Sequence, residues 1–305
     1  MPLPSATMVS PCNSPAYTGR FAPSPTGPLH FGSLVTALAS YLDAKAQGGT
    51  WLVRMEDIDP PRQLPGAEDT ILRQLEAHSL LWDGQPLYQS QRSEAYLAAL
   101  EKLSHSGLAY PCHCSRQVLQ DTGGLHQRSC VPGDPRQPHA LRLSVPNNCS
   151  IEFTDLFQGR QQQWVRQTAG DFVLLRKDGL FAYQLAVVID DAYQGISHII
   201  RGSDLLDSTA RQICLQQRLT LPTPVYGHLP IAVNEQGHKL SKQNLAPPVD
   251  NRRAGANLLA AMHWLGMQPP ADLPDTNQEV LIEWGVRNWH RTQLPRLIQI
   301  PAPAL

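Results

Sequence analysis

Hydrophobic residues in the first hundred positions switch between strand-like and helix-like spacing. From residue 17, a short strand leads into a loop rich in Pro and Gly that ends at Ser33. A helix is predicted from Phe31 to Gln47, with apolar residues three and four positions apart. A second strand at 51–55 precedes helices at 66–80 and 91–106. Because strands and helices alternate, the pattern predicts a parallel sheet with helices on its faces.

This alternation stops near residue 110. Residues 112–180 are rich in Gln, Pro and Gly and show only short strand signals, which predicts an inserted smaller domain. The sequence LAVVID at 185–190 is a continuous apolar run, typical of a buried parallel strand. A strand at 198–201, a helix at 205–218 and a strand at 225–233 follow. From about residue 252 the pattern is helical and ends in a Pro-rich tail.

The chain is therefore divided into four parts. The first part is a disordered tail at 1–18, and the second is an α/β domain in two pieces, 19–110 and 181–245. An inserted subdomain at 111–180 separates these pieces, and a helical C-terminal region follows at 246–305. The tail contains four prolines, no basic start and no apolar core, so it does not resemble a signal peptide.

Composition narrows the classes of protein. The 305 residues include 25 Lys and Arg against 26 Asp and Glu, a net charge of −1, which argues against binding nucleic acid by bulk charge alone. No apolar run approaches the roughly 18 residues of a membrane helix. Three of the six cysteines lie within 19 residues, which favours a metal site in a reducing compartment. We expect a cytoplasmic protein without a membrane segment.

The loop before the first helix is the first candidate for chemistry. It reads RFAPSPTGPLHFGS from Arg20 to Ser33. The start of a helix binds anions through its backbone N–H groups, and His30 stands there to donate to a phosphate. Gly32 allows a flat ring or a ribose to approach the backbone. Taken alone, this loop is equally compatible with a capped turn that contains a satisfied histidine.

The second candidate is the segment KLSKQ, from Lys239 to Gln243. Its two lysines, three positions apart around Ser241, are spaced to reach one triphosphate and to offset the charge of a leaving pyrophosphate. Taken alone, the segment is more simply a solvated basic turn.

Together these segments resemble the HIGH and KMSKS signatures of class I aminoacyl-tRNA synthetases. Five ordered blocks narrow the likeness to glutamyl-tRNA synthetases and, more closely, to their truncated paralogues, the glutamyl-queuosine tRNA(Asp) synthetases: RFAPSPTGPLHFGS, RMEDIDPPR, FAYQLAVVIDD, IIRGSDLL and HKLSKQN. The resemblance runs from about Gly19 to Asn244 and implies a doubly wound parallel sheet of the Rossmann type. Ser33 and Gln243 depart from the last positions of the two signatures.

A glutamate substrate requires a carboxylate for its ammonium group and arginine for its carboxylates. Three separate segments supply such charges at Arg20, Glu56 and Arg201. The resemblance surrounds the amino acid with these residues and with Ala22, Ser24 and Tyr183. The alternative is that the two arginines are surface ion-pair partners.

The resemblance also implies ATP with Mg²⁺ on its phosphates. The ATP-binding residues would be His30, Gly32, Lys239, Ser241 and Lys242. His30, Lys239 and Lys242 are the expected catalytic residues, acting by position and charge, since no covalent nucleophile is needed.

Cysteine and histidine spacing in the insertion predicts a structural zinc site. Three thiolates and an imidazole make a closed tetrahedral set, at Cys112, Cys114, His126 and Cys130. Related enzymes commonly have Tyr in the third position. His113 is a competing ligand, and three unliganded cysteines in a small core are the alternative.

The chain has 61 residues after Asn244, fewer than the anticodon-reading module of glutamyl-tRNA synthetases needs. The resemblance therefore implies activation of L-glutamate without tRNA, then transfer to queuosine in the anticodon loop of tRNA(Asp). Two alternatives are a minimal synthetase that charges a tRNA 3′ end and an inactive, RNA-binding paralogue. The retained charged residues argue against the second alternative. We expect a monomer.

Overall fold

The structure is a computed structural model that describes most of the chain. The described residues are 16–115, 117–120, 123–126, 130, 133–134, 136–234, 236–240 and 246–303. Within these ranges, no helix has the length and apolar character needed to cross a membrane.

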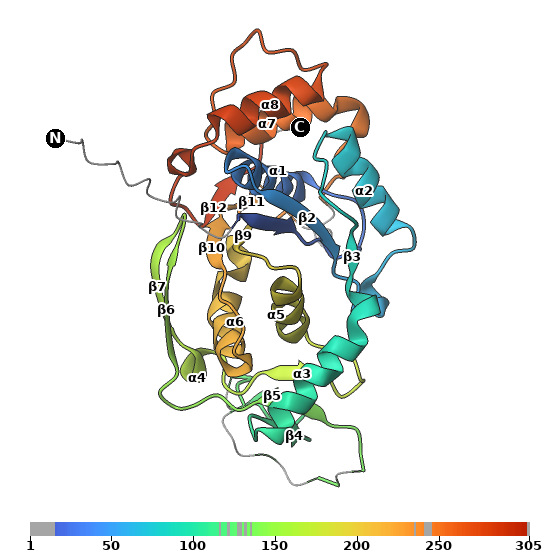
Figure 1. Cartoon of the computed structure of the whole chain (residues 1–305), viewed down its shortest axis with the longest axis vertical. Coiled ribbons are helices and arrows are strands. Elements are labelled where there is room, and N and C mark those ends of the chain that lie inside the picture. Colours follow the sequence, from blue (N-terminus) through green and yellow to red (C-terminus); the bar gives the residue numbers. More distant parts are fainter. Residues whose placement is uncertain are drawn as a thin grey trace, which may run out of the picture.

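Five parallel strands form the centre of the molecule (Figure 1). They are β1 (Thr18–Phe21), β2 (Thr50–Met55), β3 (Leu87–Tyr88), β9 (His198–Gly202) and β10 (Val225–Leu229). One ladder has the order β1-β2-β3 and the other pairs β9 with β10. A hydrogen bond from the Ser197 N–H to the Thr18 carbonyl (2.9 Å) joins β9 to β1. β2 and β3 therefore lie on one side of β1, and β9 and β10 lie on the other. This doubly wound order confirms the predicted parallel α/β architecture.

Helices cover both faces of this sheet. Helices α1 (Phe31–Ala46), α7 (Ala254–Trp264) and α8 (Gln278–Asn288) lie together on one face, above the sheet in Figure 1. On the other side are α3 (Ser93–His105), α5 (Tyr183–Tyr193) and α6 (Leu206–Leu219). Helix α2 (Ala67–Ala77) follows β2, and its Ile71 and Leu75 enter the first core. Along β2, Trp51 and Val53 face the first core while Leu52 faces the second, as a two-residue period requires.

The sequence LAVVID at 185–190 is not a strand but the middle of helix α5, so that prediction was wrong. The helix is packed between α3, α6 and the antiparallel strand β8 (Val173–Leu175), and four consecutive residues from Leu185 are buried. A helix enclosed on several sides loses its polar face, so its sequence cannot be distinguished from a buried strand by periodicity.

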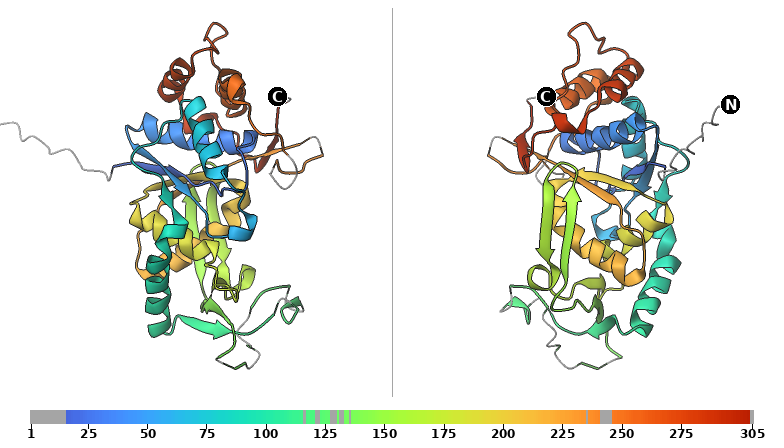
Figure 2. Two further views of the ribbon diagram at one scale, coloured as in Figure 1. Left: turned by 90° about the vertical axis from the view of Figure 1, so that its right-hand side faces the viewer. Right: turned by 60° about the vertical axis from the view of Figure 1, so that its left-hand side comes forward.

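Between α3 and α5, the chain forms antiparallel structure (Figure 2). One sheet has the order β4-β5-β8, and β6 pairs with β7 in a hairpin that leads into the short helix α4. The bounds are β4 Ala109–Cys112, β5 Ala140–Leu143, β6 Ser150–Asp155, β7 Gly159–Trp164 and α4 Val165–Thr168.

The β6–β7 hairpin packs against the central sheet rather than standing apart from it. The Leu156 N–H donates to the Tyr226 carbonyl of β10 (2.9 Å), and Phe157 lies in the first core. Part of the segment predicted as a separate insertion therefore belongs to the wall of the parallel domain, while the boundaries 111 and 180 themselves stay predictions.

The two ends of the chain also differ from expectation. Most of the predicted tail 1–18 lies outside the described residues, but Tyr17 is buried and Thr18 begins β1. The predicted strand 225–233 divides at Pro230 into β10 and β11 (Ile231–Val233). In the predicted Pro-rich tail, β12 (Gln299–Pro301) pairs in parallel with β11. Short 3₁₀ helices complete the described elements: Pro60–Arg62, Gln89–Arg92, Ser203–Leu205, Asn251–Arg253 and Arg291–Gln293.

Candidate functional site

Two cavities meet at the loop that connects β1 to α1. The larger, about 740 Å³, extends from this loop to the antiparallel sheet, and the smaller, about 410 Å³, lies against the start of α1. Ser24 and Thr26 line both cavities, so this loop is their common wall. The loop is tied to the rest of the domain by hydrogen bonds from the Glu56 N–H to the Pro23 carbonyl and from the Leu64 N–H to the Pro25 carbonyl, both 3.0 Å. Both cavities open at the carboxyl ends of the parallel strands, where open α/β sheets bind ligands.

The larger cavity has Glu56 and Tyr183 in its wall. Glu56 follows β2, and its carboxylate lies 3.4 Å from Arg54 Nη2. Burial raises the pKa of Glu56, although Arg54 and Arg20 oppose this shift. Glu56 therefore lies in a site where a bound cation would favour its charged form.

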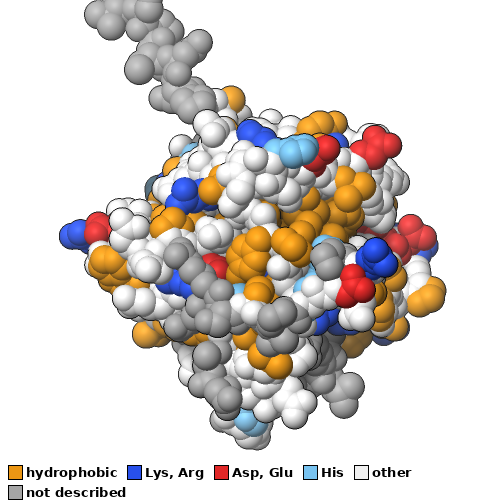
Figure 3. All heavy atoms as spheres, turned by 90° about the horizontal axis from the view of Figure 1, so that it is seen from below, with side chains coloured by type: hydrophobic (Ala, Val, Ile, Leu, Met, Phe, Trp, Pro, Cys, Tyr) orange, Lys and Arg blue, Asp and Glu red, His pale blue; other side chains and the backbone are white. Residues whose placement is uncertain are grey.

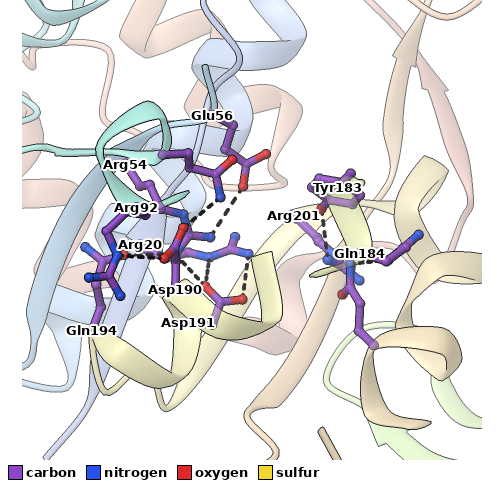
Figure 4. Close-up of polar contacts among 12 residues, drawn as sticks. Arg20, Arg54, Glu56, Arg92, Tyr183, Gln184, Asp190, Asp191, Gln194 and Arg201 are labelled. Carbon is purple, nitrogen blue, oxygen red and sulfur yellow. Dashed lines mark hydrogen bonds and ion pairs between the residues drawn. The ribbon is translucent and has the colours of Figure 1, made fainter. Parts of the chain in front are cut away.

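Behind Glu56, two buried arginines share one carboxylate (Figure 4). Asp191 of α5 accepts from Arg20 Nε (3.1 Å) and lies 2.8 Å from Arg54 Nη1. The exposed fractions of the Arg20, Arg54 and Asp191 side chains are 4%, 0% and 3%. Burial alone would raise the pKa of Asp191, but the two guanidinium groups outweigh burial and hold it below its usual value. Arg20 is therefore a buried ion-pair partner, not a surface one.

The adjacent carboxylate, Asp190, is held from the opposite direction. It accepts from Gln89, Arg92 and Tyr96, at 2.9, 3.1 and 2.5 Å. These contacts tie α5 to α3 and its preceding turn and so fix the helix that carries Asp191.

Arg201 lies at the end of β9, next to Tyr183 in Figure 4. Its Nη1 donates to the Tyr183 hydroxyl over 3.4 Å, while its Nε and Nη2 donate to His228 Nε2 (3.0 Å) and Thr209 Oγ1 (2.7 Å). The arginine is 3% exposed. Arg201 lies behind the wall of the larger cavity, and its longest hydrogen bond is to Tyr183, which lines that cavity. Its bonds to His228 and Thr209, on the other side, are shorter.

The smaller cavity brings together Ala22, Ser24, His30, Gly32 and Lys239. His30 is the N-cap of α1, where its Nδ1 accepts the Ser33 N–H (3.3 Å). A Cβ at position 32 would lie 3.2 Å from the His30 ring, so glycine gives that ring room. Lys239 Nζ pairs with Asp204 at 2.6 Å. Ser241 and Lys242 lie outside the described residues.

The four predicted metal ligands also converge. One donor atom from each of Cys112, Cys114, His126 and Cys130 lies within 4.8 Å of the others. His126 turns its Nε2 toward the sulfur atoms, 3.6 Å from Cys114 Sγ and 3.3 Å from Cys130 Sγ. This set of donors is suited to a metal ion.

Groups around the cluster orient the ligands. Tyr110 Oη donates to Asp171 (2.7 Å) and lies 2.9 Å from His126 Nδ1. Since that hydroxyl uses its proton on Asp171, it accepts from His126 Nδ1–H, which leaves Nε2 with a lone pair for a metal. Arg142 Nε donates to Cys112 Sγ (3.2 Å). Burial opposes ionisation of Cys112, but the Cys114 backbone and Arg142 outweigh it and lower its pKa.

Sequence reasoning missed several buried polar residues at this site. Arg54 and Asp191 lie inside the quoted blocks RMEDIDPPR and FAYQLAVVIDD but were given no role. The signal for Asp191 was an acidic pair directly after an apolar run, which is unusual for a buried element. Nothing in the sequence linked Asp155 to His228, because they lie 73 positions apart and meet only through the hairpin packing.

Comparisons with known proteins show the family of the chain. Residues 17–267 match the family described as "tRNA synthetases class I (E and Q), catalytic domain". The "Glutamyl-Q tRNA(Asp) synthetase" of Pseudomonas aeruginosa (strain PAO1) is 50% identical over 291 residues, covering 95% of this chain and 99% of the relative. The protein of the same name from Thiobacillus denitrificans is 50% identical over 301 residues, covering 95% of this chain and all of the relative.

Among solved structures, the glutamate-tRNA synthetase of Elizabethkingia anophelis has a TM-score of 0.78 at 26% identity, covering 95% of this chain and 68% of that one. A glutamate tRNA ligase from Elizabethkingia meningosepticum, solved in complex with its amino acid, has a TM-score of 0.76 at 26% identity, covering 94% and 67%. The chain therefore belongs to the class I tRNA synthetases of the E and Q type and, within them, to the glutamyl-Q tRNA(Asp) synthetases, which are ATP-dependent ligases.

Proposed function

We propose that this protein activates L-glutamate with ATP in the absence of tRNA and transfers the glutamyl group to queuosine in the anticodon loop of tRNA(Asp). The observation that carries the proposal is the pair of cavities that share Ser24 and Thr26. One cavity has the charges of an amino-acid site in and behind its wall, and the other is lined by three of the residues assigned to ATP, His30, Gly32 and Lys239. Two substrates bound on either side of this loop would be held next to each other for reaction.

Glutamate would bind at the inner end of the larger cavity. Its ammonium group would pair with Glu56, which burial makes receptive to a cation. A carboxylate would bind between Arg201 Nη1 and the Tyr183 hydroxyl, at the weakly held side of the arginine. Arg20 would act from behind, since two of its nitrogens already contact Asp191.

ATP would occupy the smaller cavity, with Mg²⁺ on its phosphates. His30 and Lys239 are suited to the phosphates and Gly32 to the approach of the nucleoside, and Ser241 and Lys242 are assigned to the same substrate from their place in the signature. A glutamate carboxylate oxygen attacks the α-phosphorus and the bond to the bridging oxygen of pyrophosphate breaks. The lysines and His30 offset charge on the departing pyrophosphate.

The outer part of the larger cavity would receive the acceptor nucleoside. The whole of the larger cavity, about 740 Å³, exceeds what glutamate alone fills. Arg142, Arg176 and Lys177 line this part, and Arg176 lies 3.6 Å from Asp59 of the loop after β2. On the face seen in Figure 3, described charged side chains of both signs are dispersed among hydrophobic ones. Recognition of RNA on that face would depend on individual contacts rather than on a broad basic field.

Zinc is the ion we assign to the Cys112, Cys114, His126 and Cys130 set. Three sulfur donors and one imidazole nitrogen match tetrahedral structural zinc, which would hold the loops beside the acceptor end of the cavity. Cys114 lines this cavity, so the ion would stabilise part of the substrate wall.

Purification without chelators is expected to yield about one zinc per chain, as a closed four-ligand site requires. Cys114→Ser should lose most of it, as measured by elemental analysis. Cys214→Ser is the matched control, because Cys214 is a buried thiol of α6 outside the cluster. Equal zinc content in the two variants would contradict the assignment.

The function itself is tested with ATP, radiolabelled glutamate and tRNA(Asp) that carries either queuosine or guanosine. Label is expected only on the queuosine-containing tRNA, and it should survive removal of the 3′-terminal adenosine. Label that leaves with that nucleotide would identify a minimal synthetase instead. Absence of glutamate-dependent pyrophosphate exchange without tRNA would refute the activation step and favour the inactive paralogue.

A further inference from the structure

Two buried residues behind Arg201 have no role in the chemistry proposed so far. His228 of β10 and Asp155 at the end of β6 are both fully buried, and His228 Nδ1 lies 2.6 Å from an Asp155 carboxylate oxygen. We propose that Asp155 and His228 are positioning residues that hold Arg201 in the orientation that binds the glutamate carboxylate. This inference rests on the proposed function, because it takes Arg201 as a substrate-binding residue.

The hydrogen bonds of Asp155 determine its charge. Its Oδ1 accepts from the backbone N–H groups of Phe157 (3.0 Å), Gln158 (2.9 Å) and His228 (3.0 Å). With His228 Nδ1 on Oδ2, the carboxyl group has four donors around it. Burial would raise the pKa of Asp155, but the contacts with His228 and the backbone outweigh it and lower the pKa. Asp155 is therefore ionised, and His228 Nδ1 carries a proton.

This tautomer leaves His228 Nε2 as an acceptor. Arg201 Nε donates to it at 3.0 Å. The Thr209 hydroxyl accepts from Arg201 Nη2 (2.7 Å) and lies 3.1 Å from His228 Nε2. Two edges of the guanidinium group are thus fixed from behind, which leaves Nη1 directed toward Tyr183 and the cavity.

Protonation of His228 would remove the hydrogen bond that it accepts from Arg201. A proton on Nε2 would set a donor against the Arg201 donor and place two cations in contact. The groups that face His228 are Asp155 from β6, Arg201 from β9, Thr209 from α6 and Asp204 from the turn after β9, and the Tyr226 ring is stacked beside it. Burial lowers the pKa of His228, assisted by Arg201 and opposed by Asp155 and Asp204. The neutral form is therefore favoured at neutral pH.

The hairpin makes this arrangement possible. Asp155 ends β6, and the turn after it packs against β10 (Figure 2). The β6–β7 hairpin therefore supplies the negative charge that orients His228. Gln158 Nε2 adds a bond to the His228 carbonyl (2.9 Å).

The test compares substitutions that keep or remove the acceptor at Nε2, using glutamate-dependent ATP–pyrophosphate exchange. His228→Asn retains a donor near Asp155 but no atom that reaches Arg201, and its KM for glutamate is expected to rise about tenfold or more with a smaller change in kcat. His228→Gln offers an amide oxygen near the former Nε2 and should recover part of the loss. Asp155→Asn should raise KM as His228→Asn does, because its amide would donate to Nδ1 and force the proton onto Nε2.

His198→Asn is the control for loss of a histidine on a central strand. His198 lies at the opposite end of β9 from Arg201, so the KM for glutamate should stay unchanged. Thr209→Val, nearly equal in shape, tests the same arrangement if the His228 variants fail to fold, and it should also raise KM for glutamate. Wild-type KM values for glutamate in His228→Asn, Asp155→Asn and Thr209→Val would overturn the inference.

The pH profile gives a second readout. In the wild type, KM for glutamate should rise as the pH falls below the usual histidine range of about 6.5, because His228 then takes a proton. In His228→Gln this rise should be absent, apart from what is due to the substrate's own carboxyl groups. Identical profiles would count against the proposal.

One further variant separates failure of this inference from failure of the proposed function. Arg201→Lys should weaken glutamate binding if the site is assigned correctly. A normal KM for glutamate in Arg201→Lys would overturn the glutamate site itself, whereas an impaired Arg201→Lys beside normal His228 and Asp155 variants would overturn only the positioning role.

Discussion

Replacing Asp191 with alanine is expected to lower the free energy of unfolding by about 3–5 kcal/mol. Asp191 is the shared carboxylate of Arg20 and Arg54, and all three side chains are buried. Without it, two guanidinium groups would remain inside the protein, and the nearby carboxylates Glu56 and Asp190 would offset their charge only in part. The loss is measured by urea denaturation, from the shift of the midpoint at constant slope.

The matched control is Glu152→Ala. Glu152 pairs with Arg160 on the solvent-facing side of the β6–β7 hairpin, where the exposed fractions of the two side chains are 49% and 78%. Such a pair contributes about 0–1 kcal/mol. If Asp191→Ala lost no more stability than Glu152→Ala, the buried pairing would not stabilise the fold as we infer.

Replacing Arg201 with alanine should reduce kcat/KM for glutamate in pyrophosphate exchange by about two to three orders of magnitude, equivalent to about 3–4 kcal/mol. The change removes the guanidinium group that we assign to a substrate carboxylate and leaves His228 Nε2 without its donor. KM for ATP should change little, because the side chains that Arg201 contacts, Tyr183, Thr209 and His228, do not line the smaller cavity.

Arg160→Ala supplies the comparison for loss of an arginine. Arg160 is exposed on the β6–β7 hairpin, and its removal should leave exchange at the wild-type rate. A wild-type KM for glutamate in Arg201→Ala would show that the substrate carboxylate binds elsewhere.

Much of the fold followed from local pattern. Helix α1 begins and ends within one residue of its predicted bounds, because a histidine cap, a regular apolar stripe and Gly48-Gly49 all agree on one helix. The metal ligands converge as their spacing predicted, since the four lie within 19 residues and bringing together the ends of so short a segment costs little chain entropy. In both cases the information is local.

Where prediction failed, the deciding contacts were distant. Helix α5 was assigned as a strand because the packing that hides its polar face comes from α3 and α6. The hairpin position depends on Phe157 and on β10, and the sequence contains no short-range signal for either contact. The Asp155–His228 contact, 73 positions apart, is a result of that packing.

The loop between the two cavities has an entropic consequence. Pro23, Pro25 and Pro28 restrict its backbone, and hydrogen bonds hold it to the segments that contain Glu56 and Leu64. A loop of this composition has few conformations to lose, and folding has already removed most of them. Either substrate therefore meets a wall that needs no ordering when it binds, so more of the interaction energy of each substrate is expressed as affinity.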